Sequence, residues 1–101
     1  MTGYSAVRYL PADHPAAAGH FPGNPIIPGA VLLREVVSAL SAGNDAVCHE
    51  IRSAKFLHPV RPGDRMVIVW EAKTDGEIGF ICSAGTPERR VLIGTLRMRA
   101  E

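Results

Sequence analysis

The chain has 101 residues, of which 47% are hydrophobic and 21% are charged, so its composition is that of a globular protein and not of a disordered segment. This length predicts one domain over residues 1–101, with no room for a second core. The formal net charge of +1 at pH 7 creates no strong field, which argues against nucleic acid as the main ligand.

No stretch approaches the roughly 18 apolar residues of a membrane span, and the first ten residues lack the pattern of a secretion signal. The two cysteines, Cys48 and Cys82, have neither metal-ligand spacing nor the density of a disulfide scaffold. We therefore expect buried thiols in a reducing compartment. These features predict a cytoplasmic protein with no membrane span, no metal and no cofactor.

The first predicted strand covers residues 4–10, where hydrophobic and polar residues alternate weakly. A proline-rich segment follows and extends to Gly29. Its prolines are Pro11, Pro15, Pro22, Pro25 and Pro28. Because proline fixes its own φ angle and biases the preceding residue to extended geometry, this segment is predicted to be a stiff, non-helical loop.

A helix is predicted next, with Pro28 in its first turn, where the missing N–H group costs nothing. Apolar residues cover most of its circumference, so the helix is expected to be buried on most sides. Its polar stripe consists of Arg34, Ser38 and Ser41, and Glu35 lies beside this stripe. Gly43, followed by Asn44 and Asp45, is expected to end the helix.

The rest of the chain predicts four strands, over residues 46–57, 66–73, 77–84 and 91–99. The strand 66–73 alternates cleanly and places Met66, Ile68, Trp70 and Ala72 on one face. Asp75-Gly76 is a strong hairpin signal between the second and third of these strands.

One helix that is apolar on most sides, beside about five antiparallel strands, has one economical solution: the sheet curls around the helix. The predicted fold class is therefore α+β. Sheet edges and one helix flank stay uncovered in a single copy, so we expect a dimer or a higher homo-oligomer.

The stretch GHFPGNPIIPG at residues 19–29 resembles the signature of the 3-hydroxyacyl-acyl-carrier-protein dehydratases. Residues 54–56, 59–60 and 62–64 resemble a second part of that family, and the resemblance runs from about residue 12 to the C-terminus. By this resemblance, we expect the chain to lack a helix and strand segment that is found at the start of typical members. The resemblance implies a hot-dog fold, in which a curled antiparallel sheet wraps one central apolar helix.

The resemblance also implies a hydro-lyase, which eliminates water from a 3-hydroxyacyl thioester to give a trans-2-enoyl thioester. The thioester would be carried by acyl carrier protein or coenzyme A, in fatty-acid, polyene or polyketide synthesis. His20 matches the catalytic histidine, whose neutral imidazole can take a proton. Gly29 matches the glycine whose backbone N–H binds the thioester carbonyl. The substrate is expected to contact four further residues, which are Phe21, Pro28, Val31 and Arg34.

One position departs from the family, in which a helix carboxylate stands fourteen residues after the histidine. Here that residue is Arg34, and Glu35 comes one residue later, about 100° further around the helix. Glu35 could still supply the acid, or Arg34 could bind an anionic group or take part in a different step. Structural roles are open too: Arg34 could extend its stem over apolar surface, and Glu35 could be solvated or salt-bridged.

Two other functions fit the same features. The chain could be a non-catalytic acyl-binding subunit, or a partner subunit of a hot-dog heterodimer that lends its His20 to a site with an intact acid. It could also be a thioesterase, with Glu35 as the only nearby carboxylate.

Acyl carrier protein, with its phosphopantetheine-linked acyl chain, is the expected partner. Because that protein is acidic, a basic rim is expected near the mouth of the acyl tunnel. The candidates are Arg61, Arg65, Arg89, Arg90, Arg97 and Arg99. His14 is interpreted as a loop residue near this mouth, because no third ligand with suitable spacing supports a metal there. His49 and His58 are interpreted as ordinary surface or half-buried residues.

Overall fold

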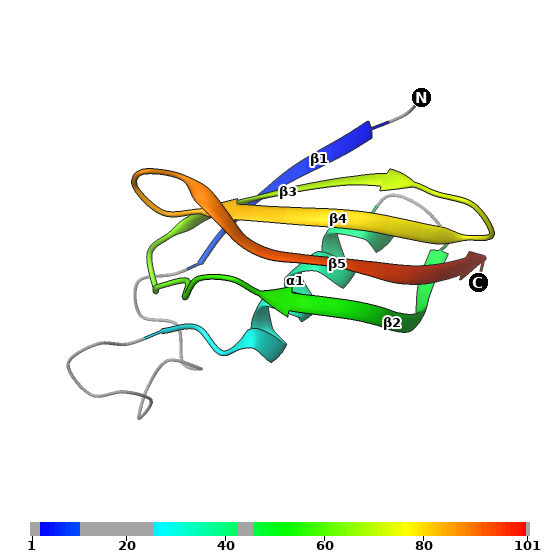
Figure 1. Cartoon of the computed structure of the whole chain (residues 1–101), viewed down its shortest axis with the longest axis horizontal. Helices are drawn as coiled ribbons and strands as arrows, with labels where there is room; N and C mark the ends of the chain where they lie inside the picture. Colours follow the sequence, from blue (N-terminus) through cyan, green and yellow to red (C-terminus); the bar gives the residue numbers. More distant parts are fainter. Residues whose placement is uncertain (1–2, 11–25, 43–45, 101) are drawn as a thin grey trace.

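The computed structural model describes residues 3–10, 26–42 and 46–100 of the chain (Figure 1). In chain order these residues form β1 (Gly3–Tyr9), α1 (Gly29–Ser41), β2 (Ala46–Phe56), β3 (Arg65–Ala72), β4 (Glu77–Ala84) and β5 (Arg89–Ala100). No helix among them is long and apolar enough to cross a membrane.

The five strands form one antiparallel sheet in the order β1-β3-β4-β5-β2, and α1 lies against one face of it (Figure 1). This arrangement confirms the expected α+β hot-dog fold. Consecutive strands β3, β4 and β5 are neighbours, whereas β1 and β2 are the two edge strands. The segment from β1 to β2 therefore crosses the whole sheet and carries α1 with it.

Several element boundaries differ slightly from those expected. Pro28 lies just before α1 as its N-cap, with φ −59° and ψ 146°, because an extended ψ is incompatible with a first helical residue. α1 ends at Ser41, and the Ala42 N–H donates to the carbonyl of Ser38. The expected helix stop at residues 43–45 lies outside the described residues. β5 begins at Arg89, two residues before the expected start.

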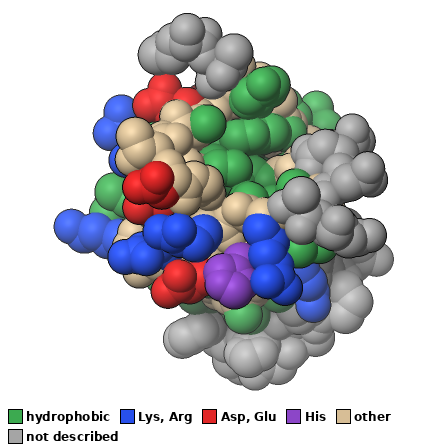
Figure 2. All heavy atoms as spheres, turned by 90° about the vertical axis from the view of Figure 1, so that its right-hand side faces the viewer, with side chains coloured by type: hydrophobic (Ala, Val, Ile, Leu, Met, Phe, Trp, Pro, Cys, Tyr) green, Lys and Arg blue, Asp and Glu red, His purple; other side chains and the backbone are tan. Residues whose placement is uncertain are grey.

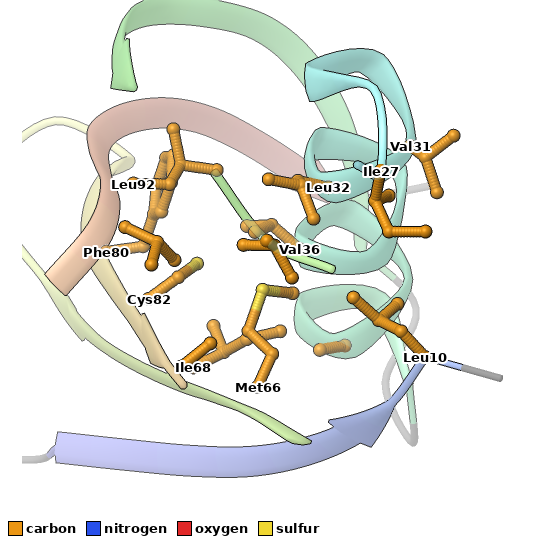
Figure 3. Close-up of a cluster of buried hydrophobic side chains, with 14 of the residues drawn as sticks. Leu10, Ile27, Val31, Leu32, Val36, Met66, Ile68, Phe80, Cys82 and Leu92 are labelled. Atoms are coloured by element: carbon orange, nitrogen blue, oxygen red, sulfur yellow. The ribbon is translucent and has the colours of Figure 1, made fainter. Parts of the chain in front are cut away.

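The core lies between α1 and one face of the sheet. Leu32 and Val36 point from α1 toward the sheet side chains of Phe80, Cys82 and Leu92 (Figure 3). Those five side chains are at most 2% exposed. Burial of apolar side chains of this size typically stabilises a fold by about 1.5–3 kcal/mol each, so this layer fixes where α1 sits.

The sheet has two distinct faces, as the alternation in β3 predicted. Met66 and Ile68 face α1 and are fully buried, while Val67 and Val69 lie on the opposite face. We call that opposite face, which is turned toward the viewer in Figure 1, the outer face. In the described part of the chain no second layer covers it.

The two cysteines have different surroundings. Cys82 is fully buried under α1, as expected. The same expectation was wrong for Cys48, which is only half-buried because β2 is an edge strand with a register irregularity between Cys48 and Glu50. Edge positions gain cover from one neighbouring strand only, so the residue type alone does not ensure burial.

Burial raises the pKa of the Cys82 thiol from 9.0 to about 12. In the unfolded chain this thiol ionises first, so the stability linked to it is complete below pH 9 and is lost as the pH rises toward 12. We expect the free energy of unfolding to fall above pH 9 by up to about 1.4 kcal/mol per pH unit more than in Cys82→Ala. Urea unfolding at several pH values measures this difference, and identical slopes in both proteins would contradict it.

Candidate active site

Backbone hydrogen bonds hold the two flanks of the proline-rich segment against one turn, residues 60–64. The Leu10 N–H donates to the Asp64 carbonyl at 3.0 Å, and the Gly63 N–H donates to the Leu10 carbonyl at 2.6 Å. On the other flank, the Ile27 N–H donates to the Val60 carbonyl at 2.7 Å. Leu10, Ile27 and Val60 are at most 3% exposed, so both flanks are anchored in the core.

His20 and Phe21 belong to this segment and lie outside the described residues, as does His14. Their expected roles therefore remain predictions. The residues on either side of this segment are described. The chain leaves the sheet at Leu10, and its next described residue, Ile26, precedes Ile27, which is bonded to the same turn. Both ends of the segment are thus fixed to one turn, and the end at Ile27 directly precedes the N-cap of α1.

At the start of α1, no side chain of the described residues accepts a hydrogen bond from the backbone N–H groups. The Val31 and Leu32 N–H groups donate to the Pro28 carbonyl, at 3.0 and 3.4 Å. No side-chain hydrogen bond caps the helix and its first turn holds no acidic residue. The Gly29 and Ala30 amides therefore form the positive end of an uncapped helix, which suits an oxygen that gains negative charge.

Gly29 lies in close contact with the side chain of Phe56. A Cβ atom built on Gly29 would lie 2.8 Å from the Cε1 and Cζ atoms of Phe56, at the end of β2. The aromatic ring thus lies directly against the helix start, although Phe56 is 50% exposed. Sequence analysis missed this contact, because nothing in the spacing of two residues so far apart signals it.

Two of the expected substrate contacts are at this end of α1. Pro28 is half-buried, and Val31 is 7% exposed. Val31 points away from the sheet, on the side of α1 where Ile27 lies (Figure 3). Both residues surround the helix start, which is compatible with their expected role.

Arg34 lies on the exposed stripe of α1 together with Ala30 and Ser38, spaced four residues apart. This stripe faces away from the buried side chains Leu32 and Val36. The position at which the family carries a carboxylate therefore points outward in the single chain, toward any second subunit that covers the helix.

Glu35 faces a different direction. Its Oε1 atom lies 3.5 Å from the Nε atom of Arg8 on β1, and the two side chains are 29% and 30% exposed. The carboxylate thus ties α1 to the edge strand β1. This geometry agrees with the expectation that Glu35, one residue later than the family's carboxylate, points away from it, and with the salt-bridged alternative for its role. Arg8 was not singled out from the sequence.

The candidate rim arginines divide between two ends of the sheet. Arg61, Arg65, Arg89 and Arg90 are at the end where α1 begins, since Phe56 pairs with Leu92 and also contacts Gly29. Arg97 and Arg99 lie at the opposite end of β5, about 25–33 Å from Arg89 for an extended strand. That end is in view in Figure 2, where charged side chains border an apolar centre. One docking surface cannot use both groups.

Two of the rim arginines have partners among the described residues. Arg65 forms an ion pair with Glu88 at 3.6 Å, and Arg97 forms one with Glu77 at 3.9 Å and donates to the Asp75 carbonyl. Within the described ranges no group of three His, Cys, Asp or Glu side chains could hold a metal ion. His49 and His58 are both exposed.

A family model described as ApeI-like, ApeI dehydratase, matches residues 3–91 of the chain. The 3-hydroxyacyl-acyl-carrier-protein dehydratase FabZ of Sodalis glossinidius is 31% identical over 110 aligned residues, covering 84% of this chain and 73% of that protein.

Solved structures agree with the fold. An uncharacterized protein from Erwinia carotovora has a TM-score of 0.74 and 25% identity, and the match covers 97% of this chain and 83% of that one. The dehydratase heterocomplex ApeI:P from Xenorhabdus doucetiae has a TM-score of 0.75 and 20% identity, covering 95% and 86%.

The Arg8–Glu35 ion pair leads to a prediction about stability. Because both side chains are almost one third exposed, we expect a coupling free energy of about 0.2–1 kcal/mol in a double-mutant cycle of Arg8→Met and Glu35→Gln. Urea unfolding of the four proteins at low and high salt measures it, and the coupling should shrink at high salt. A coupling of zero at low salt would mean that the pair does not hold α1 to β1.

Proposed function

Since the chain belongs to the ApeI-like dehydratase family, we propose that it eliminates water from a 3-hydroxyacyl thioester to give a trans-2-enoyl thioester. The observation that carries this proposal is the uncapped start of α1 at Gly29, beside the turn that anchors both flanks of the segment containing His20. A base and an oxyanion donor are the two groups that this elimination needs first, and in the proposal His20 and the Gly29 N–H supply them.

In this proposal the thioester carbonyl accepts a hydrogen bond from the Gly29 N–H. The neutral imidazole of His20 takes a proton from C2, and the electron pair of that C–H bond moves toward the carbonyl oxygen. The developing negative charge is then stabilised by the helix start. The electrons return to form the C2–C3 double bond as the C3–O bond breaks, and the leaving hydroxide must be protonated to become water.

The source of that last proton distinguishes two versions of the mechanism. Glu35 can supply it only by leaving its partner Arg8, because the pair directs the carboxylate toward β1. The imidazolium of His20 can instead return its proton to the leaving hydroxyl, so that one residue serves as base and then acid. The second version needs no carboxylate at position 34.

A partner subunit is the second candidate function, and two observations favour it. Arg34 replaces the carboxylate and faces outward on α1, where a second chain would approach. In addition, β2 is an edge strand with exposed apolar side chains, Ile51 at 44% and Phe56 at 50%. Pairing of β2 with another chain would cover both and complete the sheet. The partner would be a second copy or a related hot-dog subunit.

The carrier of the acyl chain is proposed to be acyl carrier protein. Arg61 and Arg89 are exposed at the end of the sheet where α1 begins and form no ion pair with a described residue. They supply positive charge beside the proposed site, which would attract an acidic carrier protein and speed its association.

The reaction is tested with a short 3-hydroxyacyl-carrier protein and mass-spectrometric detection of the enoyl product. We expect wild type to form the product, His20→Ala to lose at least about 100-fold in rate, and Glu35→Gln to retain activity if His20 returns the proton. Loss in both variants would assign the acid to Glu35. No product from wild type at high enzyme concentration, but product after mixing with a related subunit, would support the partner-subunit function.

The docking proposal is tested with Arg61→Glu/Arg89→Glu. We expect binding of the carrier protein to weaken by about tenfold or more at low salt, with a smaller difference at high salt. Arg99→Glu, at the far end of β5, is the matched control and should bind like wild type. Equal loss in both variants would indicate a general charge effect and not a docking surface.

A further inference from the structure

The outer face of the sheet, on the side opposite α1, contains a hollow of about 860 Å³ that the proposed reaction does not use. Residues of all five strands line it. This volume is within the range of about 300–1,000 Å³ that is usual for small-molecule sites. The hollow is separate from the acyl site, because the sheet itself lies between the hollow and the helix start.

The floor of the hollow is an apolar row that crosses the strands. Val69, Ile81 and Ile93 are paired in register on β3, β4 and β5, so their side chains lie on the same face in neighbouring strands. Neighbouring strands are about 4.8 Å apart, so the row is about 10 Å long. Val69 is 41% exposed, and a ligand that covers this apolar row is bound more tightly because apolar surface is removed from water.

The row has polar ends. In the same register, Ser5 pairs with Val69 on one side, and Lys55 pairs with Ile93 on the other. Arg90 also lines the hollow, because the irregularity at Cys82/Ser83 lets Val91 and Leu92 both face the core and leaves Arg90 outside. Lys55 on β2 therefore lies at one end of the apolar row, and Arg90 lies beside that end, three residues before Ile93 on β5.

The charges of the hollow are unbalanced. Three cationic side chains line it, Lys55, Lys73 and Arg90, against one carboxylate, that of Glu71. None of the four forms an ion pair with a described residue. The Lys73 side chain lies across Gly79, since a Cβ atom at Gly79 would be 2.8 Å from Lys73 Cε. Gly79 thus leaves room for the Lys73 side chain beside the apolar row.

We propose that this hollow binds a single-chain amphiphile with a carboxylate head group. The head group lies between Lys55 and Arg90, and the alkyl chain lies along Val69, Ile81 and Ile93 toward Ser5. The charge of the hollow complements an anion, and the linear apolar row complements one extended chain. A second copy packed outer face to outer face fits less well, because it would bring six cations against two carboxylates.

The proposal is tested with decanoate as the probe and methyl NMR of labelled isoleucine residues in the full chain. We expect saturable shifts of the Ile81 and Ile93 methyl groups, with no shift at Ile27 beside α1. Lys55→Glu should weaken binding about tenfold or more, because a charge-assisted contact becomes repulsive. Arg99→Glu, which is exposed and outside the lining of the hollow, should leave the affinity unchanged.

The remaining outcomes each overturn the proposal. Shifts confined to Ile27 would assign decanoate to the acyl site, and decanol binding as tightly as decanoate would exclude recognition of the head group. Shifts of Ile81 and Ile93 that follow protein concentration without decanoate would assign the face to a second copy. Lys55→Gln is the milder variant should Lys55→Glu unfold, and circular dichroism checks both.

Discussion

Three backbone hydrogen bonds to the turn at residues 60–64 are the constraint on which the rest of the molecule depends. They hold Leu10 and Ile27 at one place, although seventeen positions separate these residues in the chain. Leu10, Ile27 and Val60 are buried, and a buried backbone group without a hydrogen-bond partner destabilises the fold. Each of these hydrogen bonds therefore removes such a cost. The consequence is structural: Leu10 and Ile27, on either side of the segment that contains His20, are both fixed to one turn, and Ile27 lies next to the start of α1.

Where local pattern determines structure, the sequence predicted it well. The strict alternation of Met66 to Ala72 separated the two faces of β3 correctly, and Asp75-Gly76 correctly predicted the hairpin that joins β3 to β4. Contacts between distant segments were not predictable in the same way. The Arg8–Glu35 pair depends on β1 pairing with β3 in one register, and the Phe56–Gly29 contact depends on the order of the strands. Neither leaves a periodic signal, since both arise from how elements pack and not from how each element forms.

The one-residue difference between Arg34 and Glu35 has a simple structural meaning. Consecutive helix residues point about 100° apart, so a carboxylate that moves by one position changes its neighbour. At position 34 a side chain lies on the exposed stripe and is available to a second subunit, while at position 35 it reaches β1 of its own chain. The carboxylate of Glu35 thus helps to attach the edge strand β1 to α1, and the outward position 34 carries the positive charge of Arg34. In the proposed reaction, which begins by removing a proton from carbon, a cation at position 34 would favour an anionic substrate or partner and would not replace an acid.

Strand β2 contributes one side chain to the helix start and the next one to the outer hollow. Lys55 and Phe56 are consecutive residues, and consecutive strand residues point to opposite faces, so one lines the outer hollow while the other covers Gly29. A slip of β2 by one residue against β5 would exchange them, which would place a charge over the helix start and an aromatic ring in the hollow. The register irregularities at Cys48/Glu50 and Ile51/Ser53 lie upstream in the same strand, and the run from Ser53 to Phe56 pairs without interruption with the run from Thr95 to Leu92. The pairing of these few residues therefore sets which side chain of β2 lies at the helix start and which lies in the hollow, and a subunit that joins the free edge of β2 would contact a strand that contributes to both.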